Sequence, residues 1–350
     1  MRTVDWADGA VVMVDQTRLP ATYTTYRAET VPDLVESIET LRVRGAPALG
    51  ASGAFGVALA AHTTDAEDFE AFAETVREKA ERVADVRPTA VNLAREVATV
   101  LAVLADCERV GQARERTLAK AREIADADVE RNRQIGAHGA DLLTDGATVM
   151  THCNAGTLAT VDWGTALGVV YSAREAGAEV SVLAPETRPL DQGARITTVE
   201  CRERAVPVTL IPDSAAGRCM QESRVDAVVV GADRVVLDGG ETFGDQAVVF
   251  NKIGTYEHAV LADRHDVPFV VAAPHATVDT GRSADEVEIE ERDPAELREV
   301  GGEQNAPADV PVYNPAFDPT PAELIDYLVT ETGVHEPPLD RAAFGAPARP

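Results

Sequence analysis

The sequence predicts an α/β protein in two parts: a mainly helical N-terminal part over residues 1–125, and a parallel sheet with helices on both faces over residues 126–335. The 350 residues are 45% apolar, which is enough to bury a large core. Apolar residues recur at helical spacing through the first part. From Ala147 onward, short β-branched runs alternate with helical stretches, a pattern typical of parallel strands joined by helices.

The N-terminal part is predicted to begin with a strand at 11–19 and to continue as helices. The segment PDLVESIETLRV places Leu34, Val35, Ile38 and Leu41 on one helical face, with Asp33 near its cap. The next segment, 45–61, is built from Ala and Gly with few bulky side chains, so other backbones can pack closely against it. Further helices are expected near 66–84, 89–106 and 112–143.

The C-terminal part is predicted to contain five strands separated by helices. The strands are expected at 148–152, 180–186, 206–213, 227–235 and 268–274, and the helices at about 165–177, 193–204, 216–223 and 251–266. An acidic, loop-like stretch at 280–312 precedes a last helix at 319–331, in which Pro321 falls in the first turn. Residues 336–350, rich in Pro and Ala, predict a loosely ordered tail.

Acidic charge is the strongest feature of the composition. The 59 Asp and Glu residues exceed the 32 Lys and Arg residues by 27, and only three of the cations are lysines. Such a surface repels nucleic-acid phosphate and favours a very salty cytoplasm, where salt screens self-repulsion. No apolar run is long enough to span a membrane and the chain starts without a secretory signal, so a cytoplasmic protein with no membrane partner is expected.

The cysteine and histidine spacing does not indicate a metal site. The four cysteines form no C-x-x-C pair, which disfavours a zinc knuckle and a disulfide framework. His152 has no second His or Cys at ligand spacing, so we interpret it as a core or turn histidine.

Two reactive side chains follow predicted strands, where ligands bind in an open parallel sheet. Cys153 is either a small core residue or a thiol beside backbone amides that favour its thiolate. Asp233 follows a very apolar strand, where partial burial would raise its pKa toward a value useful for proton transfer. The alternative for Asp233 is a turn or cap residue. Strand alternation is expected to point Arg234 to the opposite face.

Two segments offer groups that bind phosphate. Asn251 and Lys252 are predicted to open a helix whose free N–H groups would attract an anion together with the lysine. The turn Arg44–Pro47 offers a guanidinium and backbone amides, and Arg87 is a weaker case of the same kind. Each arginine can equally be an exposed turn residue. Neither of the usual nucleotide-binding phosphate loops is present in the sequence.

Seven short motifs occur in one order along the chain: Arg44–Ala48, Thr151–Gly156, Gly164–Gly168, Glu186–Pro189 with Gln192–Arg195, Gly231–Arg234, Asn251–Thr255 and Asn314–Asp318. Together they resemble the methylthioribose-1-phosphate isomerases. The surrounding superfamily includes ribose-1,5-bisphosphate isomerase and the alpha, beta and delta subunits of eukaryotic translation initiation factor two-B. The resemblance runs from about Val11 to Val334. It implies a Rossmann-like C-terminal domain, a smaller helical N-terminal domain and a homodimer.

The resemblance also implies a reaction and its residues. The reaction is the aldose–ketose isomerisation of 5-methylthioribose 1-phosphate in methionine salvage, with no metal or organic cofactor. Cys153 and Asp233 match the catalytic pair, with Asp233 as proton donor. The substrate-binding positions, chiefly around the phosphate, match Arg44, Gly45, Ala46, Arg87, Gln192, Asn251 and Lys252.

An aldose 1-phosphate cannot open to a free aldehyde, because its anomeric oxygen is esterified. Acid help is therefore needed to break the ring C–O bond, and a largely neutral Asp233 would supply it. Cys153 would then move the hydrogen from C2 to C1 as a base, or stabilise charge while a hydride shifts.

Two departures from the family pattern bear on the substrate. The segment 237–250 is longer than the family usually has and would act as a lid or reshape the pocket for the 5-substituent. Trp163, in Asp162–Trp163, either floors that pocket or packs in the core. Alternative functions are isomerisation of 5-deoxyribose 1-phosphate or ribose 1,5-bisphosphate, and a non-catalytic subunit like those of the initiation factor. Retention of both Cys153 and Asp233 disfavours the non-catalytic alternative.

Overall fold

The computed structural model of this protein describes residues 2–87, 90–339 and 341–345. The chain forms two compact units, which we call the N-terminal unit (Met1–Arg133 with Ala155–Gly164) and the C-terminal unit (Gln134–Asn154 with Thr165–Pro350). The division lies inside helix α5 (Val110–Ala140), beyond residue 125. The sequence did not indicate that 155–164 belongs with the N-terminal unit.

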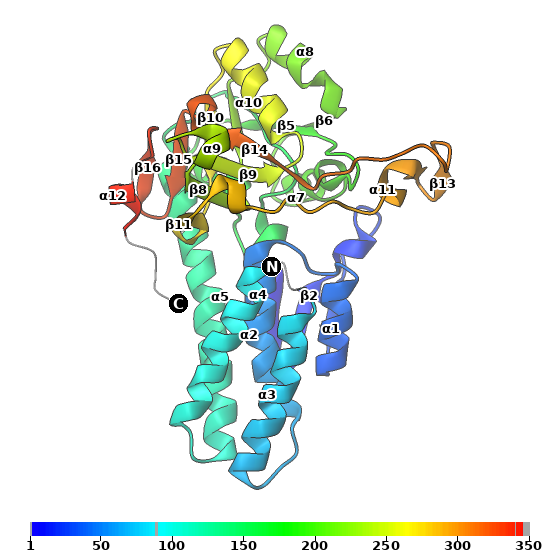
Figure 1. Ribbon diagram of the computed structural model, residues 1–350, viewed down its shortest axis with the longest axis vertical. Coiled ribbons are helices and arrows are strands. Elements are labelled where there is room, and N and C mark those ends of the chain that lie inside the picture. The colour runs from blue at the N-terminus through cyan, green and yellow to red at the C-terminus, as the bar shows by residue number, and fades with distance from the viewer. Residues whose placement is uncertain (1, 88–89, 340, 346–350) are drawn as a thin grey trace. The chain divides into compact units, whose positions relative to one another are not determined.

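The N-terminal unit combines a small antiparallel sheet with helices (Figure 1). Its strands are β1 (Val4–Ala7), β2 (Ala10–Val14) and β3 (Thr25–Ala28). Its helices are α1 (Val31–Glu39), α2 (Ala46–Thr63), α3 (Phe69–Asp85), α4 (Val91–Leu101) and the first part of α5, with short 3₁₀ turns η1 (Gln16–Arg18) and η2 (Ala102–Asp106). Thr30 and Asp33 form a capping box that starts α1. The predicted helical N-terminal part is confirmed.

Helix α2 is the central helix of this unit, and its small residues explain why. Every residue from Ala48 to Ala61 is buried. A Cβ atom on Gly53 would lie 2.9 Å from Leu93 of α4, and one on Gly56 would lie 3.0 Å from Leu34 of α1. The predicted close packing therefore depends on the absence of side chains at these two glycines.

The C-terminal unit is built on a seven-stranded sheet (Figure 1). Its order is β16 (Gly333–His335), β15 (Tyr327–Thr330), β10 (Phe269–Ala272), β7 (Ala227–Val230), β4 (Thr148–Met150), β5 (Ser181–Pro185) and β6 (Val208–Ile211). All neighbours are parallel except β15 and β16. Numbered along the chain, the six parallel strands have the order 3-2-1-4-5-6 from the β6 edge, which is the Rossmann arrangement. The predicted parallel sheet is confirmed.

Helices connect the parallel strands. They are α6 (Ala166–Glu175), α7 (Thr198–Glu203) with the π-helical turn η4 (Gly193–Thr197) before it, α8 (Ala216–Gln221) and α10 (Thr255–Arg264). Because parallel crossovers are right-handed, α6 and α7 cover one face of the sheet, and α8 and α10 cover the other. Buried side chains such as Val228, Val230 and Phe269 form the core beneath them.

A second sheet, which the sequence analysis missed, has the order β11 (Val278–Ser283), β8 (Arg234–Asp238), β9 (Val248–Lys252) and β14 (Phe317–Pro321). The predicted strand 227–235 is wrong as one element, because the chain leaves the large sheet after Val230 and enters the second sheet at Arg234. The predicted loop 237–250 is mostly an antiparallel hairpin of β8 and β9 that encloses the short helix α9 (Gly240–Phe243).

The predicted helix 319–331 is also wrong. The segment ends β14, forms the 3₁₀ turn η8 (Ala322–Leu324) and then becomes strand β15. Pro319 and Pro321 pair opposite Phe250 and Val248 at the edge of the second sheet, where prolines are tolerated because no further strand needs their missing N–H.

The stretch 280–312 is largely irregular, with helix α11 (Ala295–Arg298) and the two-residue strands β12 (Glu299–Val300) and β13 (Glu303–Gln304). In the region predicted as a loose tail, Leu339 is buried, and so is Phe344 of helix α12 (Arg341–Phe344). None of the helices in the described residues has the length and apolar character that crossing a membrane requires.

Candidate active site

Strands β4 and β7 are neighbours at the point where the strand order of the large sheet reverses. Met150 pairs with Val228 across them, and both strands run in the same direction. Cys153 lies three residues beyond the end of β4, and Asp233 lies three residues beyond the end of β7. Ligands of such sheets bind outside the carboxyl ends of the strands at this reversal. The two predicted catalytic residues therefore leave the sheet side by side.

Cys153 adopts a left-handed backbone conformation, with φ 59°. Its N–H donates to Thr187 Oγ1 (2.9 Å), and its carbonyl accepts from the Thr197 hydroxyl (2.7 Å). Cys153 is half-buried, whereas Cys107, Cys201 and Cys219 are buried. No helix begins directly after Cys153, since α6 starts only at Ala166, so the expected helix amides beside the thiol are not there.

The loop after β5 contacts Cys153 and is itself held by the end of β6. The Asp213 carboxylate accepts hydrogen bonds from the N–H groups of Thr187 (2.7 Å) and Arg188 (2.8 Å). Gly193 allows the loop to close, because a Cβ there would lie 1.8 Å from the Pro185 carbonyl oxygen. Burial raises the pKa of Glu186, and the negative charge of Asp213 raises it further.

Gln192, a predicted substrate-binding residue, is buried in the same loop region. Its Oε1 atom has no hydrogen-bond partner among the described residues. A buried amide oxygen without a donor is costly, and a sugar hydroxyl would satisfy it.

Asp233 is exposed, so the expected partial burial is wrong for this unit. The reason is the turn after Val230, which carries Asp233 away from the apolar strand β7 to the start of β8. Its N–H donates to the Phe250 carbonyl (3.0 Å), and the register of β8 and β9 places Asp233 opposite Asn251. Arg234 pairs with Asp279 (2.9 Å), as expected for a side chain on the other face.

Asn251 and Lys252 end strand β9, so the prediction that they open a helix is wrong. The Asn251 side chain donates to Thr255 Oγ1 (2.9 Å) at the start of α10. The Lys252 ammonium lies 4.8 Å from the centre of the Phe317 ring. Each of these two side chains contacts the element that braces its strand.

The start of α10 is occupied by a carboxylate rather than open to an anion. Asp318 accepts hydrogen bonds from the N–H groups of Gly254 (2.6 Å) and Tyr256 (3.1 Å). Burial raises the pKa of Asp318 to about 6. The expected anion site at this helix end is therefore already satisfied by the protein.

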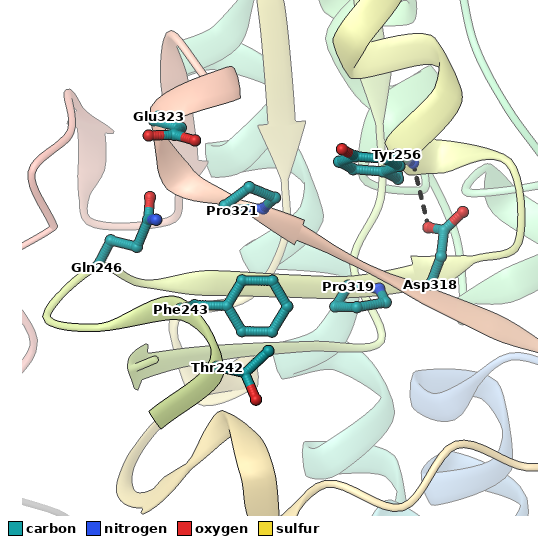
Figure 2. Close-up of a pocket in the computed structure, with 8 residues that line it drawn as sticks. All are labelled: Thr242, Phe243, Gln246, Tyr256, Asp318, Pro319, Pro321 and Glu323. Atoms are coloured by element: carbon teal, nitrogen blue, oxygen red, sulfur yellow. Dashed lines mark hydrogen bonds between the residues drawn. The ribbon is translucent and has the colours of Figure 1, made fainter. Parts of the chain in front are cut away.

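Asp318 also lines a cavity of about 470 Å³ (Figure 2). Figure 2 shows Phe243, Pro319 and Tyr256 around it, with the hydrogen bond from the Tyr256 N–H to Asp318 drawn as a dashed line. None of the predicted site residues lines this cavity.

His152 and His258 form a buried pair that the sequence analysis did not foresee. His152 Nε2 lies 2.7 Å from the Ile253 carbonyl oxygen, so it donates, and its Nδ1 accepts from His258 Nε2 (3.1 Å). Burial lowers the pKa of His152 and lowers that of His258 to about 3. Both nitrogens of His152 are thus engaged, which agrees with a core histidine and not with a metal ligand.

The other predicted binding residues belong to the N-terminal unit. Arg44 and Arg87 are half-buried, and Ala46 is exposed. Gly45 caps α2 with φ 90°, and a Cβ there would lie 2.1 Å from the carbonyl oxygen of Ala159 in the 3₁₀ turn η3 (Thr157–Ala159). Only glycine fits this position. The segment that Gly45 contacts begins two residues after Cys153 in the sequence.

Trp163 is buried in the N-terminal unit, with the Arg133 guanidinium 4.1 Å from its ring centre. This placement agrees with the core interpretation of Trp163.

Comparison with known proteins decides the family. The model of the initiation factor 2 subunit family matches residues 42–337. The chain belongs to this family. A Methanosarcina acetivorans protein is 51% identical over 341 residues, covering 97% of this chain and 95% of that protein. A Desulfitobacterium hafniense protein named methylthioribose-1-phosphate isomerase is 46% identical, with 95% of each chain covered.

Solved structures of the initiation factor 2 subunit family carry two kinds of name. The 5-methylthioribose 1-phosphate isomerase of Pyrococcus horikoshii has a TM-score of 0.91 and 38% identity, covering 98% of this chain and 94% of that one. A structure titled translation initiation factor eIF-2B, subunit delta, from A. fulgidus also has a TM-score of 0.91, with 49% identity, covering 97% of this chain and 96% of that one. The family fold is therefore shared over nearly the whole chain.

Proposed function

We propose that this protein is a methylthioribose-1-phosphate isomerase that interconverts 5-methylthioribose 1-phosphate and 5-methylthioribulose 1-phosphate in methionine salvage. The observation that carries the proposal is the placement of Cys153 and Asp233 after neighbouring parallel strands at the reversal point of the sheet. Relatives that are 46% identical over nearly their whole length bear this name.

The proposed chemistry begins with Asp233. Its protonated carboxyl donates to the ring oxygen, the bond from that oxygen to C4 stays intact, and the bond to C1 breaks. Bound substrate would exclude water from this otherwise exposed carboxyl and raise its pKa, as burial does for other carboxyl groups. Asp233 later accepts the proton of the C2 hydroxyl as the ketone forms, which restores its starting state.

Hydrogen moves from C2 to C1 by one of two routes. As a thiolate, Cys153 removes the C2 proton and returns it to C1 through an enol phosphate; alternatively, a hydride shifts directly while the thiol stabilises charge. Turnover in D2O separates the routes, because a proton route admits solvent deuterium at C1 and a hydride route does not.

We propose substrate-binding roles, chiefly at the phosphate, for residues of both units: Arg44, Gly45, Ala46, Arg87, Gln192, Asn251 and Lys252. Lys252 supplies positive charge, and Gln192 supplies a buried amide with an unsatisfied oxygen. Proton transfer by Asp233 and hydrogen transfer at Cys153 need no metal or organic cofactor.

We further infer a cytoplasmic homodimer that works in high salt and binds no nucleic acid. The net charge of −27 supports the salt requirement and disfavours nucleic acid. Light scattering at molar KCl tests the dimer, and a monomer would contradict it.

Turnover of three sugar phosphates tests the function. The purified protein in molar KCl is given 5-methylthioribose 1-phosphate, 5-deoxyribose 1-phosphate and ribose 1,5-bisphosphate, and we expect the highest kcat/KM for the first. Preference for either of the others would assign a different 5-substituent. The relative titled as an initiation-factor subunit supplies the second candidate function. No turnover of any sugar, with stable binding to an initiation factor, would favour that non-catalytic role.

A further inference from the structure

We propose that Thr187 and Thr197 form a hydroxyl clamp that holds Cys153 in its left-handed backbone conformation and so directs its thiol toward the substrate. They are positioning residues, since they act through Cys153. The importance of the clamp for turnover rests on the proposed function, whereas its geometry does not.

The two hydroxyl groups grip opposite sides of one residue. Thr187 Oγ1 accepts the Cys153 N–H (2.9 Å) and donates to the Pro185 carbonyl (3.2 Å). Thr197 Oγ1 donates to the Cys153 carbonyl (2.7 Å) and accepts from the Asn154 amide (3.2 Å). Both threonines are 0% exposed, so water cannot replace either hydroxyl.

The clamp is itself anchored. Thr187 has a left-handed backbone, φ 63°, and its N–H is held by Asp213 (2.7 Å) at the end of β6. Thr197 ends the π-helical turn η4, directly before α7, and its neighbour in the network, Asn154, also donates to Glu200 (2.6 Å). The ends of β4, β5 and β6 are therefore tied to each other through Cys153.

A left-handed conformation is unfavourable for a residue with a Cβ atom, so it persists only where the surroundings enforce it. With neither hydroxyl present, Cys153 can relax to a right-handed or extended backbone. Either change reorients its Cα–Cβ bond and moves the sulfur. The clamp thus accounts for both the unusual backbone angle and the direction of the thiol.

Valine substitutions test the clamp, because valine keeps the shape of threonine and removes the hydroxyl. We expect Thr187→Val and Thr197→Val each to lower kcat about tenfold or more while KM stays within about threefold. Thr187→Ser and Thr197→Ser, which keep the hydroxyl, should return kcat to near the wild-type value. Thr320→Val is the matched control, since Thr320 is equally buried in the same unit and its hydroxyl has no partner among the described residues.

Hydrogen exchange supplies a readout that needs no substrate. The Cys153 amide lies outside the strands, yet we expect it to exchange at least about 100-fold more slowly than in an unstructured peptide. Thr187→Val should remove this protection, and Thr197→Val should retain it, because only Thr187 accepts that N–H.

The two readouts separate failure of the clamp from failure of the proposed function. Rapid exchange of the Cys153 amide in the wild type overturns the clamp, and so does full kcat in both valine variants. Serine variants as impaired as the valine variants also overturn it, because the γ-methyl contact would then be responsible. A wild type that turns over no sugar phosphate removes the function alone, and exchange still decides the clamp. If a valine variant does not fold, the serine variants and wild-type exchange decide.

Discussion

Asp128 is a buried carboxyl group of the N-terminal unit, and it should make the stability of that unit depend on pH. The group is 96% buried, and burial raises its pKa from 3.8 to about 6. Its carboxylate accepts the Val161 N–H (2.8 Å) and the Asn132 amide (3.1 Å). These bonds lower the pKa, but burial outweighs them.

The sign and size of the effect follow from this shift. Because the folded state binds the Asp128 proton more tightly than the unfolded state, this group stabilises the fold fully below pH 3.8, and the contribution is lost as pH rises through 6. A shift of about two pKa units corresponds to about 3 kcal/mol, of which roughly half is lost between pH 5 and pH 8.

Asp128→Asn removes the ionisation and keeps an oxygen that can accept the Val161 N–H. We therefore expect the wild type to lose about 1.5 kcal/mol more stability than Asp128→Asn between pH 5 and pH 8. Denaturant unfolding at constant high salt measures this difference. Tryptophan fluorescence reports the N-terminal unit, since both tryptophans, Trp6 and Trp163, belong to it.

Asp126→Asn is the matched control, because Asp126 lies on the same helix with its side chain 63% exposed. It should follow the wild-type pH dependence. Parallel stability curves for the wild type and Asp128→Asn would refute the reasoning, because they would show that burial does not control this carboxyl.

Three further predictions concern the reaction, the fold and the salt requirement. Asp233→Asn should keep its melting temperature and lose about 100-fold or more in kcat, and near wild-type turnover would remove Asp233 from the mechanism. Gly45→Ala should destabilise the N-terminal unit by roughly 2 kcal/mol or more in denaturant unfolding, because its Cβ would lie 2.1 Å from the Ala159 oxygen, whereas Gly111→Ala, with nothing within 4 Å, should not destabilise it. The melting temperature should rise as KCl increases to molar concentrations, and a flat response would contradict the interpretation of the acidic surface.

Local patterns were enough to predict the elements that carry the fold. The helical spacing of Leu34 and Ile38 and the small residues of α2 identified packed helices, and the apolar runs around Val149 and Val228 identified the parallel strands. These patterns are encoded within a few turns or residues of chain. The ends of such strands then indicated Cys153 as a site residue.

The errors arose where distant segments decide the structure. The 319–331 segment has apolar residues that fit a helix or a strand, and its pairing with β9 and β10 selects the strand. Asp233 was expected to be buried because the turn into the second sheet has no signature of its own. The partnership of His152 and His258 joins residues 106 positions apart, which no local pattern can show.

The attraction of phosphate must come from side chains rather than from the α10 helix end. Asp318 already accepts two N–H groups there, and its negative charge opposes a second anion. Among the described residues, no carboxylate lies within ion-pair distance of the Lys252 ammonium, which instead lies over the Phe317 ring. In a chain with 59 acidic residues, placing a lysine against an aromatic face keeps its positive charge available to a ligand. This placement gives Lys252 a physical reason to be one of only three lysines, because a compact ammonium can approach a phosphate oxygen as a point charge.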